Sequence, residues 1–289
     1  MNRRAQRGFT LIELTLVLFV LALSAHLAVR ELSRQRAARL RTAADAQLDA
    51  MAAAVWDGAS ASGFLSDMGR LPSALPLDPG DPASPLSLRE LWACPEGTGD
   101  HRARPATAAN LAPGAPAEIA DPDVLVPCGW GGPYLSLPTA ATRLLDPWGN
   151  PAETPDPAGL ARLLDAEGAP VAAAGQPVAA VRHFGSDGLD DAERPPERPD
   201  QADAMRAFAA PSARLLLTFE PDTIPEIRWY APLGDKIDGG VVIPGAGASQ
   251  VLLEGLTPGV RFLKIFRADE APRVVQATLR PGRDTALEL

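Results

Sequence analysis

An apolar run at residues 9–29 directly follows a short basic leader and constrains what the rest of the chain can be. At about 1.5 Å of rise per residue, a helix of this length crosses a bilayer core of about 30 Å. Three arginines and no acid precede the run, so the positive-inside rule predicts a single-pass protein with a cytoplasmic N-terminus. A secretory signal peptide is the alternative, but its apolar region usually spans only about 7–15 residues.

Glu13 lies inside this run, although a carboxylate at the centre of such a span costs about 2.5–3.5 kcal/mol on insertion scales. The surrounding segment, residues 8–14, reads GFTLIEL. It resembles the cleavage and methylation signal of type IV pilins and type II secretion pseudopilins. The resemblance implies that prepilin peptidase cuts after Gly8 and methylates the new amine of Phe9. It also implies that Glu13 faces that amine on a neighbouring subunit during assembly.

Beyond residue 29, apolar residues at three- and four-residue steps predict that the helix continues to about Asp57. Three later motifs resemble, in the same order, the head domain of the major pseudopilin of type II secretion. They read DMGRLP at 67–72, GPYL at 132–135 and DPWGNP at 146–151. Each combines turn residues with apolar or aromatic anchors, so we interpret them as structural.

An acidic segment begins with HFGSDGLDD at residues 183–191. It resembles the loop by which major pseudopilins bind calcium, an ion that takes six to eight oxygen ligands. Asp187 is the leading candidate by its position in the motif. The full set of candidate ligands is Asp187, Asp190, Asp191, Asp200 and Asp203. The alternative is a solvated acidic linker, because a stretch with proline and arginine replaces the Gly-rich spacing of the family.

Cys94 and Cys128 are the only cysteines, and neither has the spacing of a metal ligand. Export would place them in an oxidising compartment, where we expect them to form a disulfide; two buried free thiols are the alternative. We find no catalytic motif and therefore expect no enzyme. The net charge of −9 argues against a nucleic-acid partner. Arginines between residues 30 and 41 form a local basic patch for lipid headgroups or an acidic neighbouring subunit.

Residues 205–289 lie outside the pseudopilin resemblance and contain seven short β-like runs separated by turn signals. This pattern predicts a small β-sandwich, which resembles immunoglobulin-like or carboxypeptidase-regulatory-like modules. Two insertions rich in proline, alanine and glycine lie between residues 72 and 129 and at 152–178. We interpret both as surface decoration, with lateral contacts between subunits as the alternative.

The sequence therefore predicts an α+β protein with a cleaved leader (1–8), a long helix (9–58), a small antiparallel-sheet head (59–204) and an all-β domain (205–289). We expect an inner-membrane pseudopilin with its C-terminal domains in the periplasm, which assembles with like and unlike subunits into a filament that drives export. Its expected partners are prepilin peptidase, other pseudopilins, the secretion platform and the membrane. The alternative is a minor or tip subunit whose β domain binds cargo, another pilin or a surface.

Overall fold

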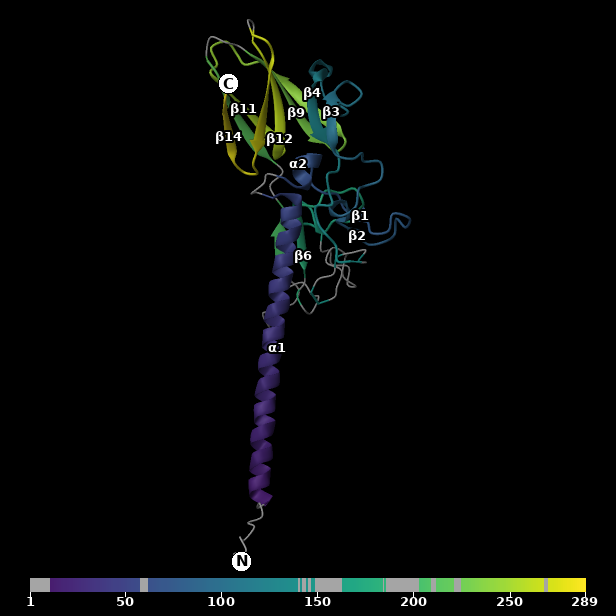
Figure 1. Ribbon diagram of the computed structural model, residues 1–289, viewed down its shortest axis with the longest axis vertical. Coiled ribbons are helices and arrows are strands. Elements are labelled where there is room, and N and C mark those ends of the chain that lie inside the picture. Colours follow the sequence, from purple (N-terminus) through teal and green to yellow (C-terminus); the bar gives the residue numbers. More distant parts are fainter. Residues whose placement is uncertain are drawn as a thin grey trace, which may run out of the picture.

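The protein consists of one long helix that carries its globular part at one end (Figure 1). The computed structural model describes residues 11–57, 62–139, 141, 144, 147–148, 163–183, 185, 203–208, 212–220, 225–267 and 270–289.

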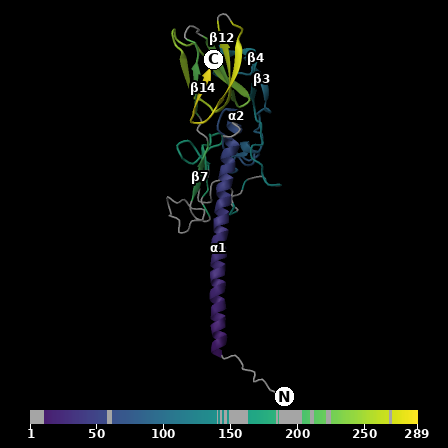
Figure 2. The same ribbon diagram turned by 60° about the vertical axis from the view of Figure 1, so that its left-hand side comes forward.

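Helix α1 spans Leu11–Val55, which confirms the predicted long helix. Residues 11–36 are all exposed, and this part of the helix extends away from the globular part in both views (Figures 1 and 2). The last turns pack against the head, where Leu48, Met51 and Val55 are buried. A short helix, α2 (Phe64–Met68), follows and fills the same core.

The head is built from short elements around this end of α1. Two small sheets have the strand orders β1-β2 and β5-β6-β7, and all their strand pairs are antiparallel. Their bounds, with the 3-10 helix η1, are β1 (Leu75–Pro76), β2 (Leu86–Ser87), η1 (Arg89–Leu91), β5 (Leu163–Leu164), β6 (Ala180–His183) and β7 (Ala204–Ala207). Strand β7 spans the predicted boundary at residue 205 and pairs with β6, so it belongs to the head sheet. Arg206 Nη2 joins it to α1 through an ion pair of 2.6 Å with Asp49.

Two facing sheets form the C-terminal β-sandwich, with strand orders β11-β8-β14 and β10-β9-β12-β13. All pairs are antiparallel except β14 with β8, which is parallel. Leu215 and Leu217 of one sheet and Leu263 of the other face the shared core, as alternation of apolar and polar residues predicts. The strands are β8 (Ala213–Thr218), β9 (Glu226–Leu233), β10 (Lys236–Val242), β11 (Gln250–Leu256), β12 (Gly259–Phe266), β13 (Arg273–Leu279) and β14 (Asp284–Glu288).

Part of the first insertion covers the outer face of the four-stranded sheet. Strands β3 (Arg102–Ala106) and β4 (Asp121–Cys128) form an antiparallel hairpin, with the 3-10 helix η2 (Ala117–Ile119) between them. Side chains of these elements pack with Tyr230 and Ile237 into a separate core. The interpretation of this insertion as surface decoration is therefore wrong for the hairpin, because its apolar residues complete a core of the sandwich.

A buried ion pair fixes the hairpin to the sheet beneath it. Lys264 Nζ of β12 lies 2.5 Å from Asp121 Oδ2 of β4, and both side chains are largely buried. Tyr230 lies nearby, and burial raises the pKa of its hydroxyl to about 12. Since breaking a buried pair leaves an uncompensated charge, the contact specifies how the hairpin sits on the sheet.

The sandwich is docked closely on the head. Gly69 has φ +64° at the end of α2, and a Cβ atom there would lie 1.7 Å from the carbonyl oxygen of Pro232 in β9. The backbone N–H of Gly234 donates to the carbonyl of Met68 at 2.8 Å. Ser66 of α2 likewise lies against Gly259 of β12. The head and the sandwich therefore share a tight interface that admits no side chain at Gly69.

Candidate functional site

The N-terminal part of α1 presents an apolar surface that no described residue of the head covers. Leu11 is 83% exposed and Phe19 is 66% exposed. The helix is long and apolar enough to cross a membrane by its length and composition. The core helix of a soluble protein would bury such residues, so this surface requires lipid or other helices around it.

The processing and assembly residues lie at the start of this helix. Gly8 and Phe9 are outside the described residues. Glu13 is in the first turn of α1 and is exposed. Nearby hydroxyl groups are satisfied within the helix, since Thr15 Oγ1 donates to the Ile12 carbonyl at 3.0 Å. This segment therefore places a single carboxylate on an otherwise apolar helix end.

The predicted calcium ligands lie mostly outside the described residues, which is where Asp187, Asp190, Asp191 and Asp200 fall. Asp203 is described at the start of the β7 region, with its Oδ2 3.9 Å from Arg182 Nη1. Arg41 Nη2 donates to the Asp203 carbonyl at 3.1 Å. Among the described residues, no group of three or more histidine, cysteine or acidic side chains is placed to hold a metal ion.

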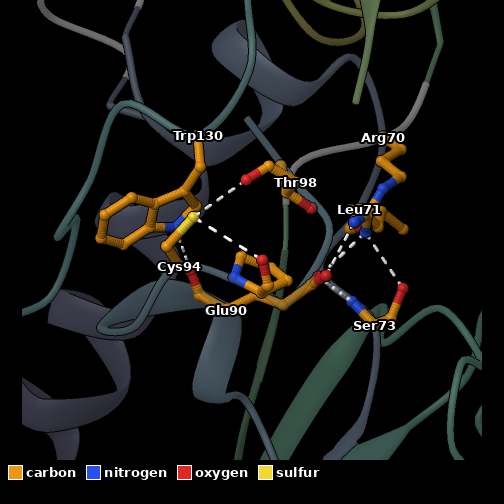
Figure 3. A network of polar contacts seen from close by, with 8 residues as sticks. Arg70, Leu71, Ser73, Glu90, Cys94, Thr98 and Trp130 are labelled. Atoms are coloured by element: carbon orange, nitrogen blue, oxygen red, sulfur yellow. Dashed lines mark hydrogen bonds and ion pairs between the residues drawn. The ribbon is translucent and has the colours of Figure 1, made fainter. Parts of the chain in front are cut away.

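The two cysteines are free thiols in the structure, which does not contain the predicted disulfide. The Cys94 thiol lies 3.5 Å from the Thr98 carbonyl and 3.7 Å from the Pro95 carbonyl (Figure 3). Cys128 is instead buried in the core beneath the β3–β4 hairpin. The two sulfur atoms thus have different surroundings, and burial raises the pKa of both thiols.

A buried glutamate that the motifs do not include organises the head (Figure 3). Glu90 is 2% exposed, and its carboxylate accepts hydrogen bonds from Arg70 at 2.9 and 2.7 Å and from the Ser73 N–H at 2.6 Å. The Trp130 indole N–H donates to the Glu90 carbonyl at 2.7 Å. This network joins the first head motif to Trp130, two residues before the second motif. The only signal for it in the sequence is that two charged residues, Arg89 and Glu90, stand between the apolar residues Leu88 and Leu91, which are buried in the structure.

Tyr134 of the second motif makes a further connection, which joins this motif to α2. Its hydroxyl accepts from the Gly131 N–H at 2.8 Å and donates to Asp67 Oδ2 at 2.9 Å. His101 Nε2 lies 3.9 Å from the other carboxylate oxygen. Burial raises the pKa of Asp67, while the hydrogen bond from Tyr134 and the nearby His101 act in the opposite direction. Burial also raises the pKa of Tyr134, which keeps it a neutral donor.

The contacts of Glu90 and Tyr134 hold loops of the head in place and are structural. The residues with a defined chemical role therefore lie on α1.

His183 is buried beside Trp148, with 5.4 Å between ring centroids. The Gly185 N–H donates to its Nδ1 at 3.4 Å. That environment is that of a packed structural histidine.

Comparison with protein families matches residues 3–29 to the prokaryotic N-terminal methylation motif. A comparison with curated proteins gives no match. The matched residues include Gly8, Phe9 and Glu13 and run into the exposed part of α1. The chain thus carries a type IV pilin-like prepilin signal on a long apolar helix, which indicates a pilin-like protein processed by prepilin peptidase.

Proposed function

We propose that this protein is a structural subunit of a type II secretion pseudopilus. Prepilin peptidase removes the leader after Gly8 and methylates Phe9, and the mature subunit waits in the inner membrane with its head in the periplasm. One observation carries the proposal: the methylation motif is continuous with a helix whose first part extends, exposed and apolar, from a folded head. The order of the three head motifs favours the type II system.

Assembly then transfers the apolar helix from lipid into the helical core of the filament. Glu13 pairs there with the methylated amine of a neighbouring subunit, which offsets the cost of a carboxylate in apolar surroundings and sets the register. The secretion platform supplies subunits to the growing filament.

The assembly step is tested with Glu13→Ala, compared with Thr15→Ala two residues away. We expect Glu13→Ala to be processed normally but to lose incorporation into sheared filaments and to lose secretion. Thr15→Ala should retain both, because its hydroxyl only bonds within the helix. Normal secretion by Glu13→Ala would refute the proposed charge pairing.

Calcium binding by the acidic segment is part of this proposal, with Asp187 as the leading ligand. Ligand binding to the folded state alone raises the melting temperature. We therefore expect calcium to raise the melting temperature of the full-length protein in detergent, relative to a chelator. The increase should disappear in Asp187→Ala and persist in Asp123→Ala, whose carboxylate is exposed on β4. No calcium-dependent shift would argue for a solvated linker.

A tip or minor subunit that binds cargo is the second candidate, and one observation favours it. The sandwich lies at the end of the molecule far from the N-terminus (Figure 2). On the outer face of its three-stranded sheet, Leu252 and Ala286 flank Leu216 in register, and Leu252 is 47% exposed. The opposite sheet is covered by the β3–β4 hairpin, so this is the face open to a partner.

Point substitution separates the two candidates better than deletion of the sandwich, because deletion would remove Tyr230 and Ile237 from the core under the hairpin. Leu252→Glu alters the open face without touching a core. A tip subunit with this substitution should still enter filaments but lose cargo binding or adhesion. Unchanged secretion would favour the structural subunit.

A further inference from the structure

Four exposed arginines surround α1 just past its apolar run, and we call them the arginine collar. They are Arg30, Arg34, Arg36 and Arg39. Within the described part of the chain, none of them forms an ion pair with an acid. The next arginine, Arg41, differs because its guanidinium meets Asp45 and the Asp203 carbonyl.

The collar is a local excess of positive charge on an acidic protein. The chain has a net charge of −9, yet Glu31 is the only acid between residues 30 and 41. Glu31 accepts a hydrogen bond from Gln35 at 3.2 Å. The collar guanidinium groups are therefore available to an anion outside the protein.

The arrangement of the collar around the helix distinguishes the kinds of partner. At 3.6 residues per turn, Arg34 lies about 40° from Arg30 around the axis, whereas Arg36 and Arg39 lie about 240° and 180° away. A groove on one protein would need the charges on one face. A layer of lipid headgroups surrounds a membrane-spanning helix and meets all four.

The position of the collar along the helix agrees with this partner. Arg30 directly follows the apolar run, and Arg30 to Arg39 spans about 14 Å along the axis. The headgroup region adds about 5–8 Å to each side of the hydrocarbon core, which is enough to contain Arg30 and Arg34. Arg36 and Arg39 lie farther along the axis, and they reach the headgroups because helix side chains tilt toward the N-terminus and arginines extend toward the interface. Guanidinium groups also bind phosphate oxygens through paired hydrogen bonds.

We propose that the arginine collar binds the phosphate groups of anionic phospholipids on the membrane face nearest the head. It holds the unassembled subunit at an anionic surface that would otherwise repel the acidic protein. This inference rests only on the membrane insertion in the proposed function, and it does not depend on processing or on filament formation.

Native mass spectrometry of the full-length protein in detergent tests the inference. The added probes are phosphatidylglycerol, phosphatidylcholine and inorganic phosphate. The collar variant carries Arg30→Gln, Arg34→Gln, Arg36→Gln and Arg39→Gln, and glutamine keeps a similar helix propensity. The control variant makes the same change of charge at exposed arginines far from the collar: Arg102→Gln, Arg273→Gln, Arg280→Gln and Arg283→Gln.

We expect the wild type and the control variant to bind phosphatidylglycerol in preference to phosphatidylcholine, and the collar variant to bind at least about fivefold less of it. Equal losses in both variants would show an effect of net charge alone and overturn the proposal. Equal binding of inorganic phosphate would overturn the lipid assignment. If the collar variant loses oligomers but still binds phosphatidylglycerol, the collar makes contacts between subunits, and the proposal is overturned as well. Failure of this test leaves processing after Gly8 and assembly through Glu13 unaffected.

Discussion

The two parts of α1 are both rich in apolar residues, yet their environments are opposite. In residues 37–55, apolar side chains recur on one face and meet the head, where Leu48 is 3% exposed and Met51 is 0% exposed. In residues 11–29, apolar side chains surround the axis and all are exposed. A single stripe suits a helix on a folded head, whereas an apolar surface all round suits lipid or a helical bundle. The chain thus folds around one part and leaves the other for its surroundings to bury.

The same substitution in both parts should have different consequences. Met51→Asp is expected to destabilise the head by more than about 4 kcal/mol, because an unpaired carboxylate replaces buried apolar packing. Leu18→Asp should leave the head's free energy of unfolding unchanged and instead weaken membrane insertion by about 2.5–3.5 kcal/mol. Thermal melting in detergent measures the first effect, and alkaline extraction of membranes measures the second. Equal destabilisation of the head by both would contradict the division of α1.

The packed part also depends on the polar network around Glu90. Glu90→Ala is expected to cost about 3–5 kcal/mol, because it removes the carboxylate that pairs with Arg70 and leaves the Ser73 N–H without its acceptor, although Arg70 Nη1 keeps the Leu71 carbonyl and Ser73 Oγ. Denaturant unfolding measures this change. Glu96→Ala is the matched control, because Glu96 is exposed, and it should change stability by less than about 0.5 kcal/mol. A similar small effect at Glu90 would mean that the network is not what fixes the head motifs.

The interface of head and sandwich can be tested with two glycines of similar conformation. Gly69 has φ +64° and Gly234 has φ +62°, but only at Gly69 would a Cβ atom meet backbone, at the Pro232 carbonyl. We expect Gly234→Ala to cost about 1–2 kcal/mol for its left-handed backbone. Gly69→Ala should cost about 1–2 kcal/mol more, because the interface must also move apart. Equal melting temperatures of the two variants would show that the interface is loose.

The smallest expected effect is a pH dependence from Asp67. Burial raises its pKa in the folded state above the ordinary value of 3.8, so the folded state binds this proton more tightly than the unfolded chain. The resulting stabilisation is present below pH 3.8 and is lost as the pH rises through the raised pKa. Asp67→Asn, which keeps an acceptor for Tyr134, should flatten the stability profile in that window. A profile for Asp67→Asn identical to that of the wild type would contradict the role of burial.

Local patterns in the sequence were sufficient for the elements of the fold. Helical periodicity located α1, and the seven short β-like runs between turn signals correspond to the seven strands of the sandwich. The methylation motif likewise required only adjacent residues. These features depend on contacts close in the chain, which is why a single sequence reveals them.

The contacts between distant segments could not be predicted in the same way. The β3–β4 hairpin resembles surface decoration in the sequence because the insertion is rich in proline, alanine and glycine. The partners of its apolar residues, Tyr230 and Ile237, lie more than a hundred positions away from β4. Glu90 belongs to no motif, and its partner Arg70 is identified only by the fold. The predicted pairing of Cys94 with Cys128 rests on an oxidising compartment and on the presence of only two cysteines. Neither fact says where each sulfur atom points in the fold.

Mass spectrometry of the N-terminus of the protein, purified from cells that contain prepilin peptidase, shows directly whether the leader is removed. We expect a chain that begins at Phe9 and carries a methyl group on its amine, and an unprocessed chain when Gly8 is replaced by a bulkier residue. An intact Met1, cleavage at another bond, or normal processing of the Gly8 variant would contradict this expectation.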